Sequence, residues 1–125
     1  GSYFKAMQFC NKHGMRLASI TSAEENVRLG KFAESIGHNT SHFWTAGTTL
    51  HDDARQEWIW LTTGARILYT NWYPGEPNRG SGETPEYCLE VRSIDDDIFT
   101  WNDAPCEYRY NFICESNNPN CNIPS

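Results

Sequence analysis

Five cysteines constrain the fold of this chain more than any other feature of its sequence. They are Cys10, Cys88, Cys106, Cys114 and Cys121. None forms a C-x-x-C pair, and no Cys/His grouping has the spacing of a zinc site. The simplest interpretation is two disulfides and one further thiol, which places the protein in an oxidising, secreted or extracellular setting. The alternative is a cytosolic protein with free buried thiols. The spacing by itself does not say which cysteines pair.

Composition and charge narrow the class of protein further. A length of 125 residues fits one domain, and 38% hydrophobic with 14% aromatic residues is typical of a globular chain. The net charge of −6, with no basic cluster, argues against a nucleic-acid partner. The longest apolar runs are only a few residues, so no membrane insertion is expected. An acidic chain is compatible with a hard cation, which needs ionised oxygen ligands.

The first third of the chain predicts two helices separated by a short strand. Tyr3, Ala6, Met7 and Cys10 follow helical spacing, and His13-Gly14 is a plausible stop. Leu17 to Ile20 are expected to form a short buried strand. A second helix is expected after Thr21 or Ser22, either of which has a glutamate three residues later. Its buried face should carry Leu29, Phe32, Ala33 and Ile36, and Gly37 should end it.

The remainder predicts short strands around a long irregular loop. The expected strands cover residues 43–47, 57–60, 87–91, 98–101 and 110–114. Residues 61–86 contain four glycines and three prolines, and a loop of this length inside a small domain is usually functional or disordered. Trp72 and Tyr73 would pin it to the body, which favours function. Trp58, Trp60, Trp72 and Trp101 are expected to be mostly core residues. The fold class is therefore α+β.

Oxygen-bearing side chains bracket this loop. They are Glu76 and Asn78 on either side of Pro77, Glu86 two residues before Cys88, and Asn102-Asp103 before Cys106. A Glu-Pro bond is one of the few that tolerates the cis form, which could turn both flanking side chains toward one point. Three carboxylates and two amides make a suitable ligand set for one calcium ion. Taken alone, Glu76 and Asn78 fit an ordinary solvated turn equally well.

The ordered set of motifs resembles the C-type lectin-like domain over residues 2–115. The matching segments are Tyr3-Phe4-x-Ala6-x-x-x-Cys10, Leu17-Ala18-Ser19-Ile20, Glu24-Glu25-Asn26, Trp58-Ile59-Trp60-Leu61, Gly64, Asn71-Trp72, Glu76-Pro77-Asn78, Glu86-x-Cys88, Trp101-Asn102-Asp103-x-x-Cys106 and Phe112-Ile113-Cys114-Glu115. Any one of these triplets is weak evidence. The whole set, in register with four cysteines, is highly specific.

The resemblance implies a fold and a binding site. It implies disulfides Cys10–Cys114 and Cys88–Cys106, with a carbohydrate-recognition domain over residues 1–116 and a flexible tail over 117–125. It also implies that one set of residues ligates both calcium and sugar. These are Glu76, Asn78, Glu86, Asn102 and Asp103, the last also through its backbone carbonyl.

The order Glu-Pro-Asn resembles that of mannose-type lectins. In that mechanism, two adjacent sugar hydroxyls coordinate calcium, donate hydrogen bonds to carboxylates and accept them from amides. The resemblance therefore implies glycans with equatorial 3- and 4-hydroxyls, such as mannose, N-acetylglucosamine, glucose or fucose, before galactose. A second hypothesis is a protein-binding or structural member of the family in which calcium only braces the loop. An enzyme is not expected. The paired carboxylates suggest a glycosidase, which needs one protonated and one ionised carboxyl, but bound calcium would keep all of them ionised.

Some positions depart from the family pattern. An auxiliary second calcium site is expected to be absent, or rebuilt around Asp52 and Asp53. Cys121 lies outside the pattern; it would pair with a cysteine preceding Gly1, form a disulfide-linked dimer or remain a free thiol. Asn39-Thr40-Ser41 is a weak N-glycosylation sequon. Asp95, Asp96 and Asp97 are expected to be a solvated acidic turn. Tyr73, Arg79 and Tyr87 are candidates for extra sugar contacts.

Overall fold

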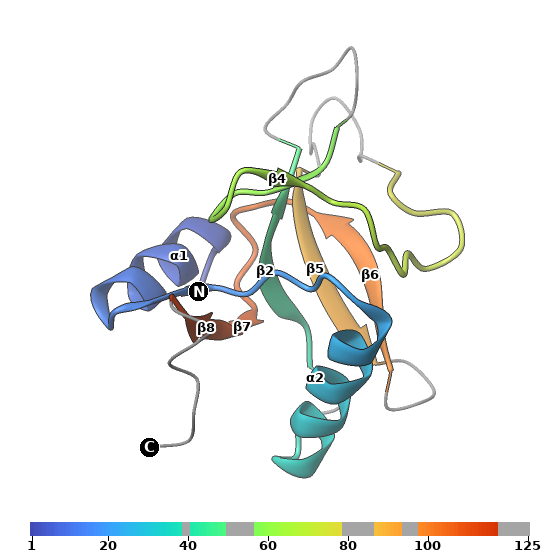
Figure 1. The fold of residues 1–125 in the computed structure, drawn as a ribbon, viewed down its shortest axis with the longest axis horizontal. Helices are drawn as coiled ribbons and strands as arrows, with labels where there is room; N and C mark the ends of the chain where they lie inside the picture. The colour runs from blue at the N-terminus through green and yellow to red at the C-terminus, as the bar shows by residue number, and fades with distance from the viewer. Residues whose placement is uncertain (39–40, 50–56, 79–86, 94–97, 118–125) are drawn as a thin grey trace.

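The structure is a computed structural model that describes residues 1–38, 41–49, 57–78, 87–93 and 98–117. The described elements are two helices and eight strands. The helices are α1 (Tyr3–Lys12) and α2 (Ala23–Ser35). The strands are β1 (Met15–Leu17), β2 (Phe43–Thr48), β3 (Ile59–Trp60), β4 (Ala65–Arg66), β5 (Cys88–Ser93), β6 (Phe99–Ala104), β7 (Asn111–Phe112) and β8 (Cys114–Ser116). This is the expected α+β architecture (Figure 1).

The larger sheet carries Asn102 and Asp103, two of the predicted ligands, on β6. Its strand order is β4-β3-β2-β5-β6, with β7 added parallel to β2, so β6 lies at an edge. The strands β5 and β6 pair over six residues, from Cys88↔Ala104 to Ser93↔Phe99. At Gly47 of β2 an added Cβ would lie 2.7 Å from that of Leu89, so only glycine allows β2 and β5 to approach this closely.

The smaller sheet pairs β1 with β8 and closes the domain near the termini. The prediction of a strand over Leu17 to Ile20 is wrong in its bounds, because the strand covers Met15–Leu17. Pairing with β8 sets these bounds, from Met15↔Ser116 to Leu17↔Cys114. Ala18 instead links the two sheets: its N–H donates to Ile113 O at 2.9 Å and its carbonyl accepts from Ala46 N at 2.8 Å.

The helices begin and end where local signals place them. Ser2 caps α1, and Ser22, not Thr21, caps α2 by accepting from the Glu25 N–H. Past the C-terminus of α1, Gly14 adopts a φ of 73°, a conformation that glycine reaches without steric cost. Tyr3, Ala6 and Cys10 form the buried face of α1, as expected.

The predicted buried face of α2 is partly wrong. Phe32 and Ile36 are 61% and 51% exposed, whereas Asn26, Gly30 and Ala33 are buried. The cause is a polar contact that hydrophobic spacing does not reveal. Asn26 donates from Nδ2 to Phe99 O at 2.8 Å, and its Oδ1 accepts from Trp101 Nε1 at 2.9 Å. These bonds turn α2 so that Asn26 faces β6.

The core lies around aromatic residues of the large sheet. Trp44, Trp60 and Trp101 are at most 2% exposed, while Trp58 and Trp72 are half-buried. Trp101 packs edge-on against Trp60, Tyr69 and Trp72 with centroid distances of 5.6–5.8 Å. The tryptophans therefore serve mainly as core, as expected.

Both disulfides that the resemblance implies are formed. Cys10–Cys114 joins α1 to β8 across a sequence separation of 104 residues. Cys88–Cys106 joins the start of β5 to the turn after β6 across 18 residues. The first bridge therefore closes nearly the whole domain, and the second fixes the end of the sheet that carries Asp103.

Removing the long bridge should destabilise the protein more than removing the short one. The chain-entropy relation gives about 4.7 kcal/mol for the Cys10–Cys114 loop and about 3 kcal/mol for the Cys88–Cys106 loop. Urea unfolding of the paired alanine variants Cys10→Ala/Cys114→Ala and Cys88→Ala/Cys106→Ala would measure the two losses. A larger loss from the short bridge would contradict this ranking.

Asn26 should be a major contributor to the stability of β6. Asn26→Leu keeps the volume but leaves Trp101 Nε1, a buried donor, without its partner. We expect a loss of about 2 kcal/mol and a melting temperature lower by roughly 10 °C. The matched control is Thr100→Val, which removes the partly buried hydrogen bond to Arg92 O and should cost under about 1 kcal/mol. Equal losses for the two variants would show that the Asn26 bridge is dispensable.

Candidate functional site: a carboxyl and carboxamide cluster at the edge of β6

The outer edge of β6 holds the loop that carries the predicted ligands. Trp101 donates from its backbone N–H to Asn71 O and accepts from Tyr73 N–H, both at 2.9 Å. Asn71 also donates from Nδ2 to Phe99 O at 2.7 Å. Trp72 packs against Trp58 and Trp101 at centroid distances of 5.1 and 5.8 Å. The expectation that Trp72 and Tyr73 pin the loop to the body is confirmed.

A tight turn then brings Glu76 and Asn78 to the edge strand. Tyr73 O accepts from the Glu76 N–H, and the Glu76-Pro77 bond is cis. The backbone N–H of Asn78 lies 3.1 Å from Glu76 Oε1 and 3.2 Å from Asp103 Oδ1. Asn78 Nδ2 donates to Glu76 Oε2 at 3.4 Å. The structure thus brings together Glu76, Asn78 and Asp103, from two segments 25 residues apart.

Asp103 is fully buried at the centre of this cluster. It pairs with Leu89 in the β5–β6 register. In a strand, backbone groups two residues apart face the same edge. The carbonyl of Asp103 therefore faces the outer edge, as that of Trp101 does. Both its carboxyl and its carbonyl are placed to serve as oxygen ligands on that side.

The cluster is electrostatically unfavourable without a cation. The pKa of Glu76 is raised above its ordinary value of 4.5 by burial, then by hydrogen bonding with Asp103 and by the negative charge of that carboxyl. The Asn78 backbone N–H and the charge of Arg92 oppose this shift. Two carboxyl groups held close together resist joint ionisation. A bound cation would remove that penalty.

Asn102, the residue before Asp103, has a side-chain oxygen that accepts no hydrogen bond from the described residues. Its Nδ2 donates to Glu90 Oε2 at 3.1 Å, while its Oδ1 is buried and has no hydrogen-bond partner in the part of the chain that the structure describes. A buried acceptor left in this state costs about 1–3 kcal/mol. Calcium prefers carboxylate, carboxamide and carbonyl oxygens. The donor set present here therefore fits a calcium ion.

Several expected positions lie outside the described residues. They are the ligand Glu86, the sequon Asn39, Cys121, Arg79, the Asp95–Asp97 turn, and Asp52 and Asp53 of the auxiliary site. Across residues 1–38, 41–49, 57–78, 87–93 and 98–117, no three His, Cys, Asp or Glu side chains gather as a metal-binding group. Of the extra sugar-contact candidates, Tyr73 is 42% exposed beside the Glu76 turn, whereas Tyr87 is half-buried.

Two further residues, which the sequence did not indicate, contact Asn102 directly or through one another. Glu90 is fully buried, and its carboxyl contacts both Asn102 and His42. The available signal was a single acidic residue between the apolar residues Leu89 and Val91. His42 does not have the sequence spacing of a metal ligand. Its contact with Glu90 of β5 arises only in the folded structure, so sequence spacing could not show it.

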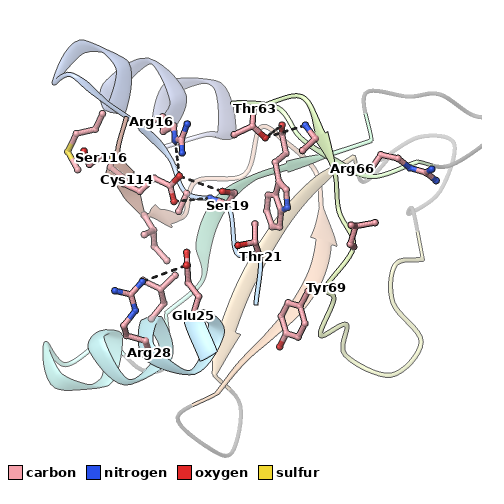
Figure 2. A pocket seen from close by; sticks show the side chains of 18 residues that line it. Arg16, Ser19, Thr21, Glu25, Arg28, Thr63, Arg66, Tyr69, Cys114 and Ser116 are labelled. Carbon is pink, nitrogen blue, oxygen red and sulfur yellow. Dashed lines mark hydrogen bonds and ion pairs between the residues drawn. The ribbon is translucent and has the colours of Figure 1, made fainter. Parts of the chain in front are cut away.

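A separate open pocket of about 940 Å³ is lined by residues of β1, β8, α2 and the β3–β4 hairpin (Figure 2). It contains none of the predicted ligands. Its charged groups pair with each other or with near neighbours: Arg16 Nε lies 2.8 Å from Glu115 Oε2, and Arg28 faces Glu25 at 3.7 Å. Burial and then Glu115 raise the pKa of Glu25. With these charges paired, the pocket offers no evident site for an ion.

The chain is thus an α+β domain with two internal disulfides and a group of carboxyl and carboxamide side chains at one sheet edge. The family model of the C-type lectin domain matches residues 1–116. The chain therefore belongs to the C-type lectin domain family. Members of this family are generally binding domains rather than enzymes, and calcium is their general metal.

Proteins with similar sequences support this assignment. Perlucin from Haliotis laevigata is 32% identical over 91% of this chain and 69% of its own length. A "C-type lectin mannose-binding isoform" from Notechis scutatus scutatus is 33% identical over 88% and 67%. Collectin-43 from Bos taurus is 34% identical over 91% of this chain but 33% of its own length.

Solved structures show the same fold. The carbohydrate-recognition domain of the mouse scavenger receptor C-type lectin superposes with a TM-score of 0.72 at 29% identity, covering 90% of this chain and 78% of that one. Human lithostathine has a TM-score of 0.78 at 21% identity, over 94% and 77%, and shows the fold alone. No described helix has the length and apolar character needed to cross a membrane.

The raised pKa of Glu76 predicts how the calcium-free protein responds to pH. The folded state holds this proton more tightly than the unfolded chain, so the stabilisation is present below the unfolded pKa and is lost as pH rises through the folded pKa. In EDTA at pH 7, Glu76→Gln should therefore melt slightly higher than the wild type. The difference should disappear below about pH 4. The effect is small because solvent screens this partly exposed group.

The matched control is Glu107→Gln, which neutralises an exposed carboxyl in the turn after β6. It should leave the melting temperature unchanged at both pH values. A Glu76→Gln variant that melts lower than the wild type at pH 7 without calcium would show that the carboxyl cluster is not repulsive.

Proposed function

We propose that residues 1–116 form an extracellular, calcium-dependent carbohydrate-recognition domain. One calcium ion would be held by Glu76, Asn78, Glu86, Asn102 and Asp103, with no auxiliary second site. The observation that carries the proposal is the convergence of Glu76 and Asn78 on the buried carboxyl of Asp103. The unpartnered Asn102 Oδ1 and membership of the family add support.

The same residues would bind the sugar. When bound, calcium supplies coordination positions for two adjacent sugar hydroxyls. The carboxylates Glu76 and Glu86 accept hydrogen bonds from those hydroxyls, and the amides Asn78 and Asn102 donate to them. Charge-assisted hydrogen bonds of this kind are directional, so they select the relative orientation of the two hydroxyls. Because these contacts involve only two hydroxyls, binding to single sugars should be weak.

The order of Glu76 and Asn78 across Pro77 favours mannose-type ligands, which have equatorial 3- and 4-hydroxyls. These include mannose, N-acetylglucosamine, glucose and fucose. The Notechis relative, which is named a mannose-binding isoform, agrees with this choice. Useful avidity would then come from multivalency, for which a disulfide-linked dimer through Cys121 is one route. Nucleic acid, membrane insertion and catalysis have no part in the proposal.

Retention on immobilised sugars tests the proposal directly. The protein should be held by a mannose resin in calcium and released by EDTA, with little retention on galactose. Calcium should bind with a Kd of roughly 0.1–1 mM, as is typical of extracellular modules. Retention on galactose alone would contradict the specificity. If neither resin holds the protein while calcium still raises its melting temperature, the metal only braces the loop and the partner is a protein.

A substitution in the cluster tests the assigned ligands. Asp103→Ala removes the central carboxyl and should weaken calcium binding by at least about ten-fold, abolishing retention on mannose. Glu107→Gln, an exposed change of equal charge outside the cluster, should retain wild-type binding. Calorimetric titration with calcium measures both. Unaltered affinity in Asp103→Ala would exclude this cluster as the site.

A further inference from the structure

Glu90 is the one fully buried acidic residue in the described part of the chain besides Asp103. It lies in the middle of β5, directly opposite Asn102 of β6 and Trp44 of β2. Burying a carboxyl group is unfavourable unless hydrogen bonds compensate. A buried carboxyl between Leu89 and Val91 therefore calls for a reason beyond packing.

Both carboxyl oxygens of Glu90 have a partner. Oε1 lies 2.9 Å from Nδ1 of His42, and Oε2 accepts from Asn102 Nδ2 at 3.1 Å. His42 is itself held in place, because its ring stacks on Tyr110 with a centroid distance of 4.7 Å and an interplanar angle of 14°. A chain of contacts thus runs from Tyr110 through His42 and Glu90 to Asn102.

This chain fixes which way the Asn102 carboxamide points. A carboxamide can rotate by 180°, which exchanges the positions of its oxygen and nitrogen. Its hydrogen-bond partners decide which of the two orientations is adopted. With the Glu90 oxygen as acceptor, Nδ2 must face Glu90, so Oδ1 faces away from it. Among the described residues, that Oδ1 is a buried oxygen without a hydrogen-bond partner. Within the same residues Nδ2 donates to Glu90 alone, which leaves its second hydrogen for another acceptor.

We propose that Glu90 is a positioning residue for the calcium and sugar site: it orients Asn102 so that Oδ1 is available to the cation and the second Nδ2 hydrogen to the sugar. This inference rests on the proposed function. Groups that orient a metal ligand through a hydrogen bond commonly change metal affinity by 10–100-fold when they are removed. The effect comes from preorganisation, since Asn102 no longer has to rotate on binding.

Calcium titration of two Glu90 variants tests the role. Glu90→Leu removes the acceptor and should weaken calcium binding about ten-fold. Glu90→Gln keeps an oxygen that can accept from Asn102, so its affinity should stay within about three-fold of the wild type. In an Asn102→Ala background, Glu90→Leu should have no further effect, because the coupling between the two residues has been removed.

A matched control separates positioning from stability. Thr45 is fully buried on the neighbouring strand, and its hydroxyl donates to Leu89 O at 3.1 Å, one residue from Glu90. Thr45→Val should lower the melting temperature in EDTA and leave calcium affinity unchanged. A residue that is merely structural would behave in the same way at position 90.

A second measurement needs no calcium, and its first part uses only the wild type. In the calcium-free wild type, the Nδ2 protons of Asn102 should exchange slowly with solvent by NMR, compared with those of the exposed Asn11. Fast exchange at Asn102 would overturn the orientation by Glu90. Glu90→Leu should bring the exchange of the Asn102 protons close to that of Asn11.

The outcomes distinguish the two proposals. If the wild type binds no calcium, the proposed function fails and the role of Glu90 fails with it. If the wild type binds calcium and Glu90→Leu binds it equally well, only the role of Glu90 is overturned. An equal loss from Glu90→Leu with and without Asn102 would show that Glu90 acts by another route, and would also overturn the inference.

Discussion

The site depends on how the edge strand β6 is held at Trp101. The backbone N–H and carbonyl of Trp101 bind Asn71 and Tyr73, and its indole N–H binds Asn26 of α2. Its ring is fully buried against Trp60, Tyr69 and Trp72. One residue therefore joins the loop, the second helix and the core. Because Asn102 and Asp103 follow it directly, the same contacts fix the positions of both candidate ligands.

At this edge a well-packed sheet lies next to a cluster of mutually unfavourable polar groups. Apolar packing and two disulfides hold the sheet, and such contacts are insensitive to the charge of the cluster. The cluster itself combines the buried carboxyl of Asp103 with the Glu76 carboxyl, whose pKa is raised, and the adjacent Asn102 has a buried oxygen without a donor among the described residues. The rigid frame keeps these unfavourable groups together, and this is the state that a cation would stabilise. Strain of this type is commonly found at binding sites.

Much of the fold could be predicted from short-range patterns. The spacing of Tyr3, Ala6 and Cys10 specified α1 and its buried face, and the capping pattern placed the start of α2 after Thr21 or Ser22, of which the structure uses Ser22. The β4 strand and the bounds of β1 could not be predicted, because Ala65–Arg66 and Met15–Leu17 become strands only through their partners. The buried face of α2 was missed because hydrogen bonds of Asn26, rather than apolar spacing, orient the helix.

The sequence by itself determined the family and the candidate ligands, since these follow from residue types in a fixed order around four cysteines. It also placed Glu76 and Asn78 on a loop rather than in an element. Only the tertiary structure decided that this turn meets Asp103, and that Glu90 and His42 lie behind Asn102. The physical reason is that these contacts join segments 12 to 48 residues apart. Their register is set by strand pairing, which local sequence does not encode.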